Sequence, residues 1–175
     1  MRTLILVSLL GANLCAQEAS NYDALKLQAR AAIAAGKFDQ ALKIAEPMAK
    51  KTPDDIELWY TVAQAHRLLG NLVEAEKATQ WMLDLRPEFI GGLWEAALLR
   101  EQFKDLSGAA DLLNDVFRRT AVTKYSERAA ILNDIARVFD KQNMKTEATQ
   151  LRKEIERLKG LEIANEKATA TPAHK

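Results

Sequence analysis

Few residues of this sequence have the types and spacing that catalysis or metal binding requires. Cys15 is the one thiol, and His66 and His174 are the two imidazoles. None of them has a second His, Cys or paired carboxylate at the spacing of zinc ligands. No nucleophile motif, glycine-rich phosphate loop or dinucleotide-binding fingerprint is present. We therefore predict no catalytic residue, cofactor site or metal site, and expect a protein that is not an enzyme.

The remaining polar candidates have structural explanations. His66 falls within a helical pattern, which favours a packed or half-buried side chain over a ligand. Asp54, Asp55 and Asp134 are interpreted as charges at helix starts or on a solvated helix face. Any function must then come from the surface that the secondary-structure elements build.

Those elements are predicted to be helices. Ala, Leu, Lys, Glu and Gln dominate the 175 residues, with only seven Gly and four Pro, and no strand-length run of alternating β-branched residues appears. The formal net charge is +1, from 25 basic and 24 acidic residues. This balance argues against a nucleic-acid partner, because such proteins usually carry a basic surplus.

The segment 1–16 has the pattern of a signal peptide. Arg2 is followed by an apolar run from Leu4 to Leu10 and by small residues that end at Ala16. We expect export from a bacterial cell, to the periplasm or the medium, with cleavage after Ala16 and no membrane insertion after processing. A buried N-terminal helix is the alternative. A lipid anchor on Cys15 is a minority interpretation, because Leu14 stands where a small residue is wanted.

A repeat organises the rest of the chain. Ala41, Ala75 and Ala109 are equally spaced, with a period of about 34 residues. Ala suits a close crossing of two helices, a Gly five residues earlier suits a left-handed helix end, and a Pro twelve residues later cannot continue a helix. The residues in phase with the alanines are Gly36, Gly70, Phe38, Leu72, Leu106, Pro53 and Pro87.

These residues, together with Trp59 before Gly70, closely resemble the tetratricopeptide repeat. The resemblance implies an all-α fold, a right-handed α-solenoid of antiparallel helical hairpins, with three repeats and a degenerate fourth. The repeats are predicted over about 22–55, 56–89, 90–123 and 129–162, within a domain over 17–162. The third repeat departs from the pattern, with Lys104 in place of Gly and Ala121 in place of Pro.

The fourth repeat is displaced by about five residues and has Asn143 where Gly is expected. A degenerate last repeat with a charged outer face suits the end of a solenoid, because no neighbour covers it. Gly160 is expected to end its last helix. The residues from 163 to 175 are predicted to be a disordered tail, since they are small and polar and contain Pro172.

In tetratricopeptide proteins, the first helix of each hairpin lines a concave groove. The resemblance implies that the groove-facing positions here are Lys26, Arg30, Tyr60, Gln64, Arg67, Trp94, Leu98, Glu101, Asn133 and Arg137, and also Asp23, Ile33 and Glu57. Trp94 beside Tyr60 and Arg67 has the composition of a binding hot spot, although packing between repeats explains it equally well. Trp59 is expected in the core, and the place of Trp81 stays open.

The resemblance leads us to expect an adaptor or scaffold that binds a peptide or partner protein in this groove. The alternative is an architectural subunit of a cell-envelope assembly that self-associates, because Leu158, Leu161 and Ile163 could form an apolar edge. One sub-family grips acidic chaperone tails with a two-carboxylate clamp. Only Lys26 matches that clamp, and Arg30, Thr61, Gly91 and Glu95 occupy its other places. We therefore expect no clamp of this kind.

Overall fold

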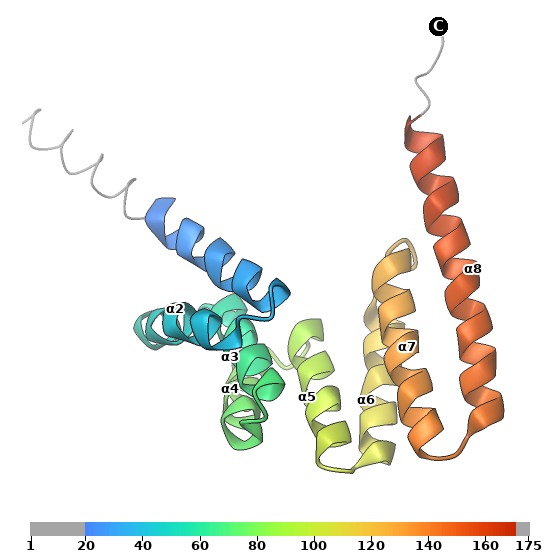
Figure 1. The fold of residues 1–175 in the computed structure, drawn as a ribbon, viewed down its shortest axis with the longest axis horizontal. Helices are drawn as coiled ribbons and strands as arrows, with labels where there is room; N and C mark the ends of the chain where they lie inside the picture. The colour runs from blue at the N-terminus through green and yellow to red at the C-terminus, as the bar shows by residue number, and fades with distance from the viewer. Residues whose placement is uncertain (1–19, 171–175) are drawn as a thin grey trace, which may run out of the picture. The chain divides into compact units, whose positions relative to one another are not determined.

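The computed structural model describes residues 20–170, and every regular element within that range is a helix. A helix over residues 20–34 comes first (Figure 1). The others are α2 (Phe38–Lys51), α3 (Ile56–Leu68), α4 (Leu72–Leu85), α5 (Ile90–Gln102), α6 (Leu106–Arg119), α7 (Tyr125–Lys141) and α8 (Lys145–Ala170). They pair in sequence order as hairpins, so the predicted all-α repeat fold is confirmed. The predicted signal peptide over 1–16 lies outside the described residues.

The chain divides into two compact units, Met1–Leu85 and Arg86–Lys175. In unit 1, α3 packs against both α2 and α4. In unit 2, α6 packs against α5 and α7, and α7 packs against α8. Each described hairpin therefore joins the next one within its unit through the first helix of that next hairpin.

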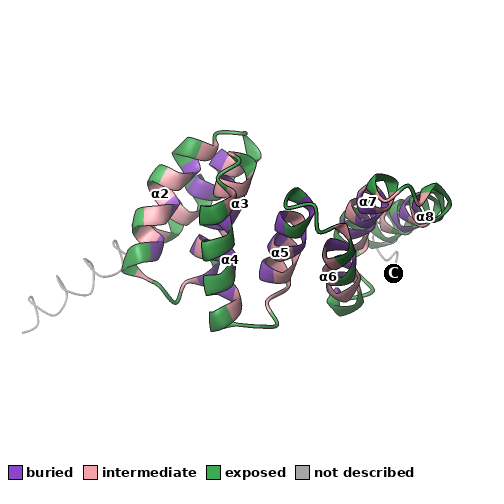
Figure 2. Ribbon diagram, turned by 90° about the horizontal axis from the view of Figure 1, so that it is seen from below, coloured by how far each residue is buried: buried purple, intermediate pink, exposed green. Residues whose placement is uncertain are grey.

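The alanines of the repeat lie where the two helices of a hairpin cross, as predicted. Ala41, Ala75, Ala109 and Ala148 are all fully buried. Their counterparts on the first helices are small as well: Ala29, Ala63, Ala97 and Ala136 are at most 1% exposed. Figure 2 shows the buried positions along the inner sides of the helices. A larger side chain at these crossings would push the helices apart.

Each hairpin turns through one residue with left-handed backbone geometry. The φ angles are 71° at Gly36, 82° at Gly70, 71° at Lys104 and 62° at Asn143. In every case the amide after this residue donates to the carbonyl five residues before it, at 2.8 to 2.9 Å, which is the long bond of a Schellman cap. Lys104 therefore replaces the expected glycine without changing the turn. The hydrogen bonds of the cap and the packing of the hairpin outweigh the conformational strain of a side chain at a left-handed position.

The displaced fourth hairpin is tied to the third through Arg128 on α7. Its Nη1 donates to the carbonyl oxygens of Phe117 at 3.0 Å and Thr120 at 2.8 Å. Its guanidinium also lies 3.7 Å from the centre of the Phe117 ring. The cation thus caps the carboxyl end of α6. The hairpin begins at Tyr125, four residues before the predicted start at 129.

The prediction of a disordered tail from residue 163 is wrong for residues 163–170, because α8 continues to Ala170. Gly160, expected to end the helix, lies inside it. The segment from Leu161 to Ala168 is rich in Ala, Glu, Leu and Lys and contains no Pro, so helical hydrogen bonding continues through the glycine. Figure 1 shows α8 extending past the start of α7. Residues 171–175 lie outside the described part.

Candidate interaction surfaces

The first helices of unit 2 carry a connected network of polar side chains. Trp94 Nε1 on α5 donates to Asp134 Oδ2 on α7 at 2.8 Å. Arg137 on α7 binds the Glu101 carboxylate with two hydrogen bonds, from Nε at 2.9 Å and from Nη2 at 2.7 Å. Lys141 Nζ donates to the same carboxylate at 2.8 Å. Arg137 also pairs with Asp134. We call these five residues the α5–α7 network.

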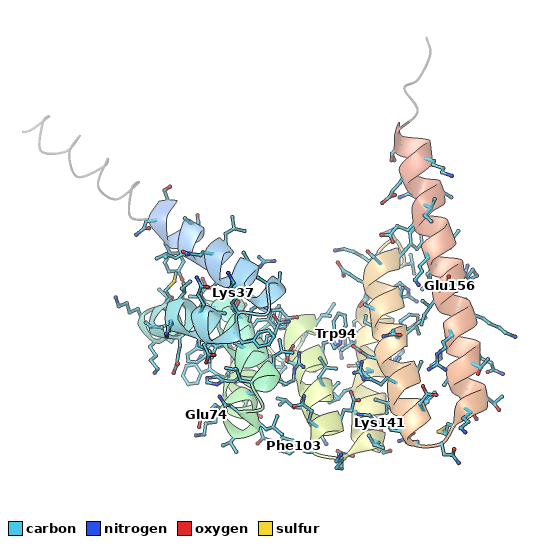
Figure 3. The ribbon with its side chains drawn as sticks, viewed as in Figure 1. Lys37, Glu74, Trp94, Phe103, Lys141 and Glu156 are labelled. Atoms are coloured by element: carbon cyan, nitrogen blue, oxygen red, sulfur yellow. The ribbon has the colours of Figure 1, made fainter. Side chains whose placement is uncertain are left out.

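Helical spacing explains why these residues meet. Trp94 and Glu101 are seven residues apart on α5, and Asp134, Arg137 and Lys141 follow at intervals of three and four on α7. Each set therefore lies on one face of its helix. Asp134, Arg137 and Lys141 all lie in the second half of α7, and Figure 3 labels Trp94 and Lys141, which lie at opposite ends of the network.

The electrostatics of the network centre on Glu101, whose side chain is only 6% exposed. The hydrogen bonds from Arg137, helped by Lys141, outweigh desolvation and lower the pKa of Glu101 to about 2. The same contact with Glu101 raises the pKa of Arg137 above its already high ordinary value. The Arg137 and Lys141 side chains keep 42% and 50% of their surface exposed. This face of the helices therefore presents two hydrogen-bond donors, Arg137 and Lys141, that are held in place by ion pairs with the buried carboxylate of Glu101.

Unit 1 has a smaller network around Asp55. Lys26 Nζ and Tyr22 Oη both donate to Asp55 Oδ2 at 2.8 Å, and Lys26 also pairs with Glu57 at 3.1 Å. Asp55 Oδ1 accepts from the backbone amides of Glu57 and Leu58 and so caps α3, as predicted for a helix-start charge. Burial disfavours its charge, but the bonds from Lys26 and Tyr22 prevail and lower the pKa of Asp55. Lys26 therefore holds the first hairpin onto α3.

The structure brings three of the predicted groove residues together, namely Trp94, Glu101 and Arg137. Leu98 is half-buried on α5 between them. Asn133 is exposed and lines a different hollow, between α7 and α8. In unit 1, Arg30 is exposed, while Tyr60, Gln64 and Arg67 lie half-buried along α3. The groove-facing role of these residues stays a prediction.

Sequence reasoning missed Asp134, Lys141 and Tyr22. Asp134 was expected on a solvated face, and this is wrong, because it accepts hydrogen bonds from both Trp94 and Arg137. The spacing of Asp134, Arg137 and Lys141 on one helical face was visible in the sequence. The identity of their partner Glu101, 36 residues before Arg137, was not, since only the packing of α7 beside α5 brings them within reach.

The tryptophans of unit 1 form an aromatic pair at its surface. Trp59 and Trp81 have ring centres 5.8 Å apart, and both indole nitrogens donate to the Pro53 carbonyl oxygen, at 3.0 and 2.8 Å. Trp59 was expected in the core, but it is only half-buried, because its ring packs against an exposed neighbour. Trp81 is 44% exposed. The pair ties the α2–α3 loop to α4.

The second hairpin contains two buried polar atoms without a hydrogen-bond partner, Nδ1 of His66 and Oγ1 of Thr79. His66 is half-buried, as predicted. Among the described residues, no group of three or more His, Cys, Asp or Glu side chains could hold a metal ion. No helix in residues 20–170 combines the length and apolar character needed to cross a membrane.

Comparison with known proteins agrees with the repeat. A family model described as "Tetratricopeptide repeat" matches residues 10–65 and again 32–88. A search of curated protein sequences gave no match.

Solved structures resemble the array of hairpins. A MamA double mutant named "MamA RS-1 ArsTM" superposes with a TM-score of 0.60 at 17% identity, covering 78% of this chain and 74% of its own. Another MamA structure gives 0.58 at 14% identity, with 90% and 81% covered. A putative kinesin light chain from Podospora anserina, with nearly identical TPR-like repeats, gives 0.56 at 20% identity, with 80% and 75% covered. At these identities the likeness shows the fold. The family match identifies the first two hairpins as tetratricopeptide repeats, and the solved structures show that the rest of the chain continues the same helical-hairpin fold.

Proposed function

We propose that this protein is a non-catalytic adaptor that binds a partner protein or peptide on the first-helix face of unit 2. Proteins built from stacked helical hairpins generally serve as scaffolds for protein partners. The observation that supports this face is the α5–α7 network, which holds Trp94 and Arg137 in fixed positions. Tryptophan and arginine are the residue types most enriched at binding hot spots, and side chains that are already ordered lose little entropy on binding.

The state of the charges indicates what kind of partner fits. Arg137 and Lys141 are both paired with Glu101, and Arg137 also with Asp134. An acidic tail would therefore have to compete with internal carboxylates for these cations. A partner that lays apolar side chains against Trp94 and Leu98, and accepts hydrogen bonds from the exposed edges of Arg137 and Lys141, suits the face better.

Cross-linking in cells followed by mass spectrometry would name the partner, and variants would then test the face. The test variant combines Glu101→Gln, Arg137→Gln and Lys141→Gln, which removes the Glu101 carboxylate together with both of its cations and leaves Asp134 its hydrogen bond from Trp94. The control combines Glu154→Gln, Arg157→Gln and Lys153→Gln on α8, which makes the same change of charge around an exposed pair.

We expect the test variant to bind the partner at least tenfold more weakly, or about 1.4 kcal/mol, and the control to bind like the wild type. Circular dichroism would establish that both variants keep their helices. Equal affinity for all three proteins would refute the assignment of the face.

We further propose export from a bacterial cell, on the pattern of residues 1–16. Cell fractionation and sequencing of the mature amino terminus would test this. A mature chain that begins after Ala16 is the expected result, whereas a lipid-modified chain that begins at Cys15 would support the anchor instead. A protein that retains Met1 and remains in the cytoplasm would contradict export.

A further inference from the structure

The last hairpin of the chain has a hollow between its two helices. Ser126, Ala129, Ala130 and Asn133 line it from α7, and Ile155, Lys159 and Glu162 line it from α8. Its volume is about 330 Å³. On α7, Asn133 follows Ala129 and Ala130 by four and three residues, and on α8 Lys159 follows Ile155 by four, so the lining residues of each helix share one face. The floor is small and apolar, and the rim carries polar and charged groups.

The same positions of the third hairpin are covered by the helix that follows it. The two hairpins are aligned by matching their left-handed residues, Asn143 and Lys104. In this alignment Asn133 corresponds to Trp94, and Lys159 corresponds to Thr120. In the third hairpin, Trp94 and Thr120 both contact α7, because Trp94 donates a hydrogen bond to Asp134 and the Thr120 carbonyl accepts one from Arg128. Ile155 corresponds to Val116, which is buried in the core that α6 and α7 share.

The first hairpin repeats this arrangement in unit 1. Matching Asn143 to Gly36, the left-handed residue of the first hairpin, pairs Ala129, Asn133 and Lys159 with Tyr22, Lys26 and Thr52. Tyr22 and Lys26 hold Asp55 at the start of α3, and the Tyr22 hydroxyl also bonds to Thr52. In both units, these positions therefore receive the first turns of the following helix.

No described helix follows the fourth hairpin, so its hollow has no such occupant among residues 20–170. Toward the start of α8 the same face is polar, whereas Ile163, four residues beyond Lys159, is apolar and 53% exposed. Arg152 corresponds to buried Leu113 of α6, and it is exposed and paired with Asp140. The hairpin is thus suited to receive the beginning of a helix and not its full length.

The helix over residues 20–34 has a matching face that is left uncovered. Ala24, Leu27 and Ala31 are exposed, with Leu27 at 69%. The alignment of the first and fourth hairpins pairs them with Ile131, Asp134 and Val138, the face of α7 that contacts the third hairpin. Asp23 is also exposed and occupies the repeat position of Glu57, which pairs with Lys26. Asp23 of the entering helix would therefore approach Asn133, which occupies the position of Lys26.

We propose that the hollow between α7 and α8 of one copy receives the first turns of the helix over residues 20–34 of a second copy. Within residues 20–170, the two surfaces are the uncovered ends of one repeat pattern. The hollow has the positions that receive a following helix in the other hairpins, and the helix over residues 20–34 has the face that such a helix presents. The contact is heterologous, because different surfaces of the two copies meet, and it generates head-to-tail chains or rings. It uses neither the α5–α7 network nor its partner.

Two single variants test the hollow and the entering helix independently. Ala130→Lys places a long charged side chain in the hollow, and Leu27→Asp places a charge on the entering face. Both positions are exposed, so the fold of the single chain is retained. The control is Val122→Asp, at a loop residue that is 74% exposed and belongs to neither surface.

Sedimentation velocity from about 10 μM to about 1 mM covers the range in which a small contact is detectable. We expect the wild type and Val122→Asp to associate with rising concentration, and each of the other variants to remain monomeric. An equal mixture of Ala130→Lys and Leu27→Asp has one intact hollow and one intact entering helix. That mixture should form a heterodimer and nothing larger.

A wild type that stays monomeric throughout would overturn the proposal. So would association that survives both variants, or a mixture that stays monomeric. The proposal would also be contradicted if the hollow bound a helix of another protein. In that case Ala130→Lys would abolish binding of that protein and leave self-association unchanged. All of these variants leave the α5–α7 network intact, so these outcomes are independent of the test of partner binding.

Discussion

Glu101 shows how a single residue acquires its role from contacts made by another helix. Its carboxylate is buried beneath Arg137 and Lys141, and the bonds that they donate hold its pKa at about 2. Because this value is below that of the unfolded chain, about 4.3, the folded state binds fewer protons than the unfolded state between these two values. Stability from this contact is complete above the unfolded pKa and is lost as pH falls toward 2.

Glu101→Gln should accordingly lower stability at neutral pH and matter little in acid. We expect a loss of roughly 2 to 3 kcal/mol at pH 7, and a difference from the wild type that shrinks as the pH falls from about 5 to about 2. Urea unfolding at several pH values measures it. Glu154→Gln, whose carboxylate is bound to exposed Arg157, is the control and should change stability little at any pH. A Glu101→Gln difference that does not vary with pH would contradict the explanation.

At the scale of elements, hairpin turns and helix lengths depend on hydrogen bonding more than on the identity of any one residue. The turn at Lys104 keeps the left-handed geometry of Gly36 and Gly70 although a side chain is present. Gly160 shows the converse, since α8 passes through it without a break. A residue type favoured at helix ends does not end a helix where the segments on both sides favour the helical state.

Gly160→Ala should therefore stabilise the protein. A Cβ atom there would have no heavy atom within 4 Å, and the backbone is helical. We expect a gain of about 0.5 to 1 kcal/mol in urea unfolding, because Ala is the better residue in a helix interior. Gly36→Ala serves as the opposite control: its φ of 71° strains a side chain, so this variant should lose stability. No gain at Gly160 would indicate that the helix ends before this residue.

At the scale of the whole molecule, the chain consists of two compact units, and the boundary falls between the second and third hairpins. Unit 2 has a core of its own around Leu113, Val116, Ile131 and Ile135, all within residues 86–175. Unit 1 has the buried cluster of Ala32, Ala41 and Ala65 and a fully buried Met82. Repeat proteins with separate cores can open locally, because each repeat depends mainly on its neighbours.

Leu113→Ala and Met82→Ala should act mainly on their own units. Both side chains are fully buried, so each truncation should cost about 3 kcal/mol. Hydrogen exchange should quicken over α5 to the paired part of α8 in the first variant, and over residues 20–85 in the second. Exchange that quickens equally along the whole chain in both variants would show that the units unfold as one.

The sequence by itself determined the helical class, the period of the repeat and the alanine crossings, because these depend on local propensity and on contacts within one hairpin. Gly36, Gly70 and Asn143 could be assigned to left-handed turns for the same reason. Lys104 could not, since its propensity opposes the turn that its hairpin imposes. The end of α8 could not be predicted from Gly160, because the helix formers after this glycine continue the helix to Ala170.

The tertiary structure alone decided which charges pair and which faces stay uncovered. Asp134 and Glu101 belong to different hairpins, and their partners are chosen by the packing of α7 beside α5. The indoles of Trp59 and Trp81 share the Pro53 carbonyl for a similar reason. Contacts between residues far apart in the chain depend on how helices are placed in space. The period of the sequence predicts that the helices stack. The side chains that meet between hairpins follow only from how the helices are placed in the folded protein.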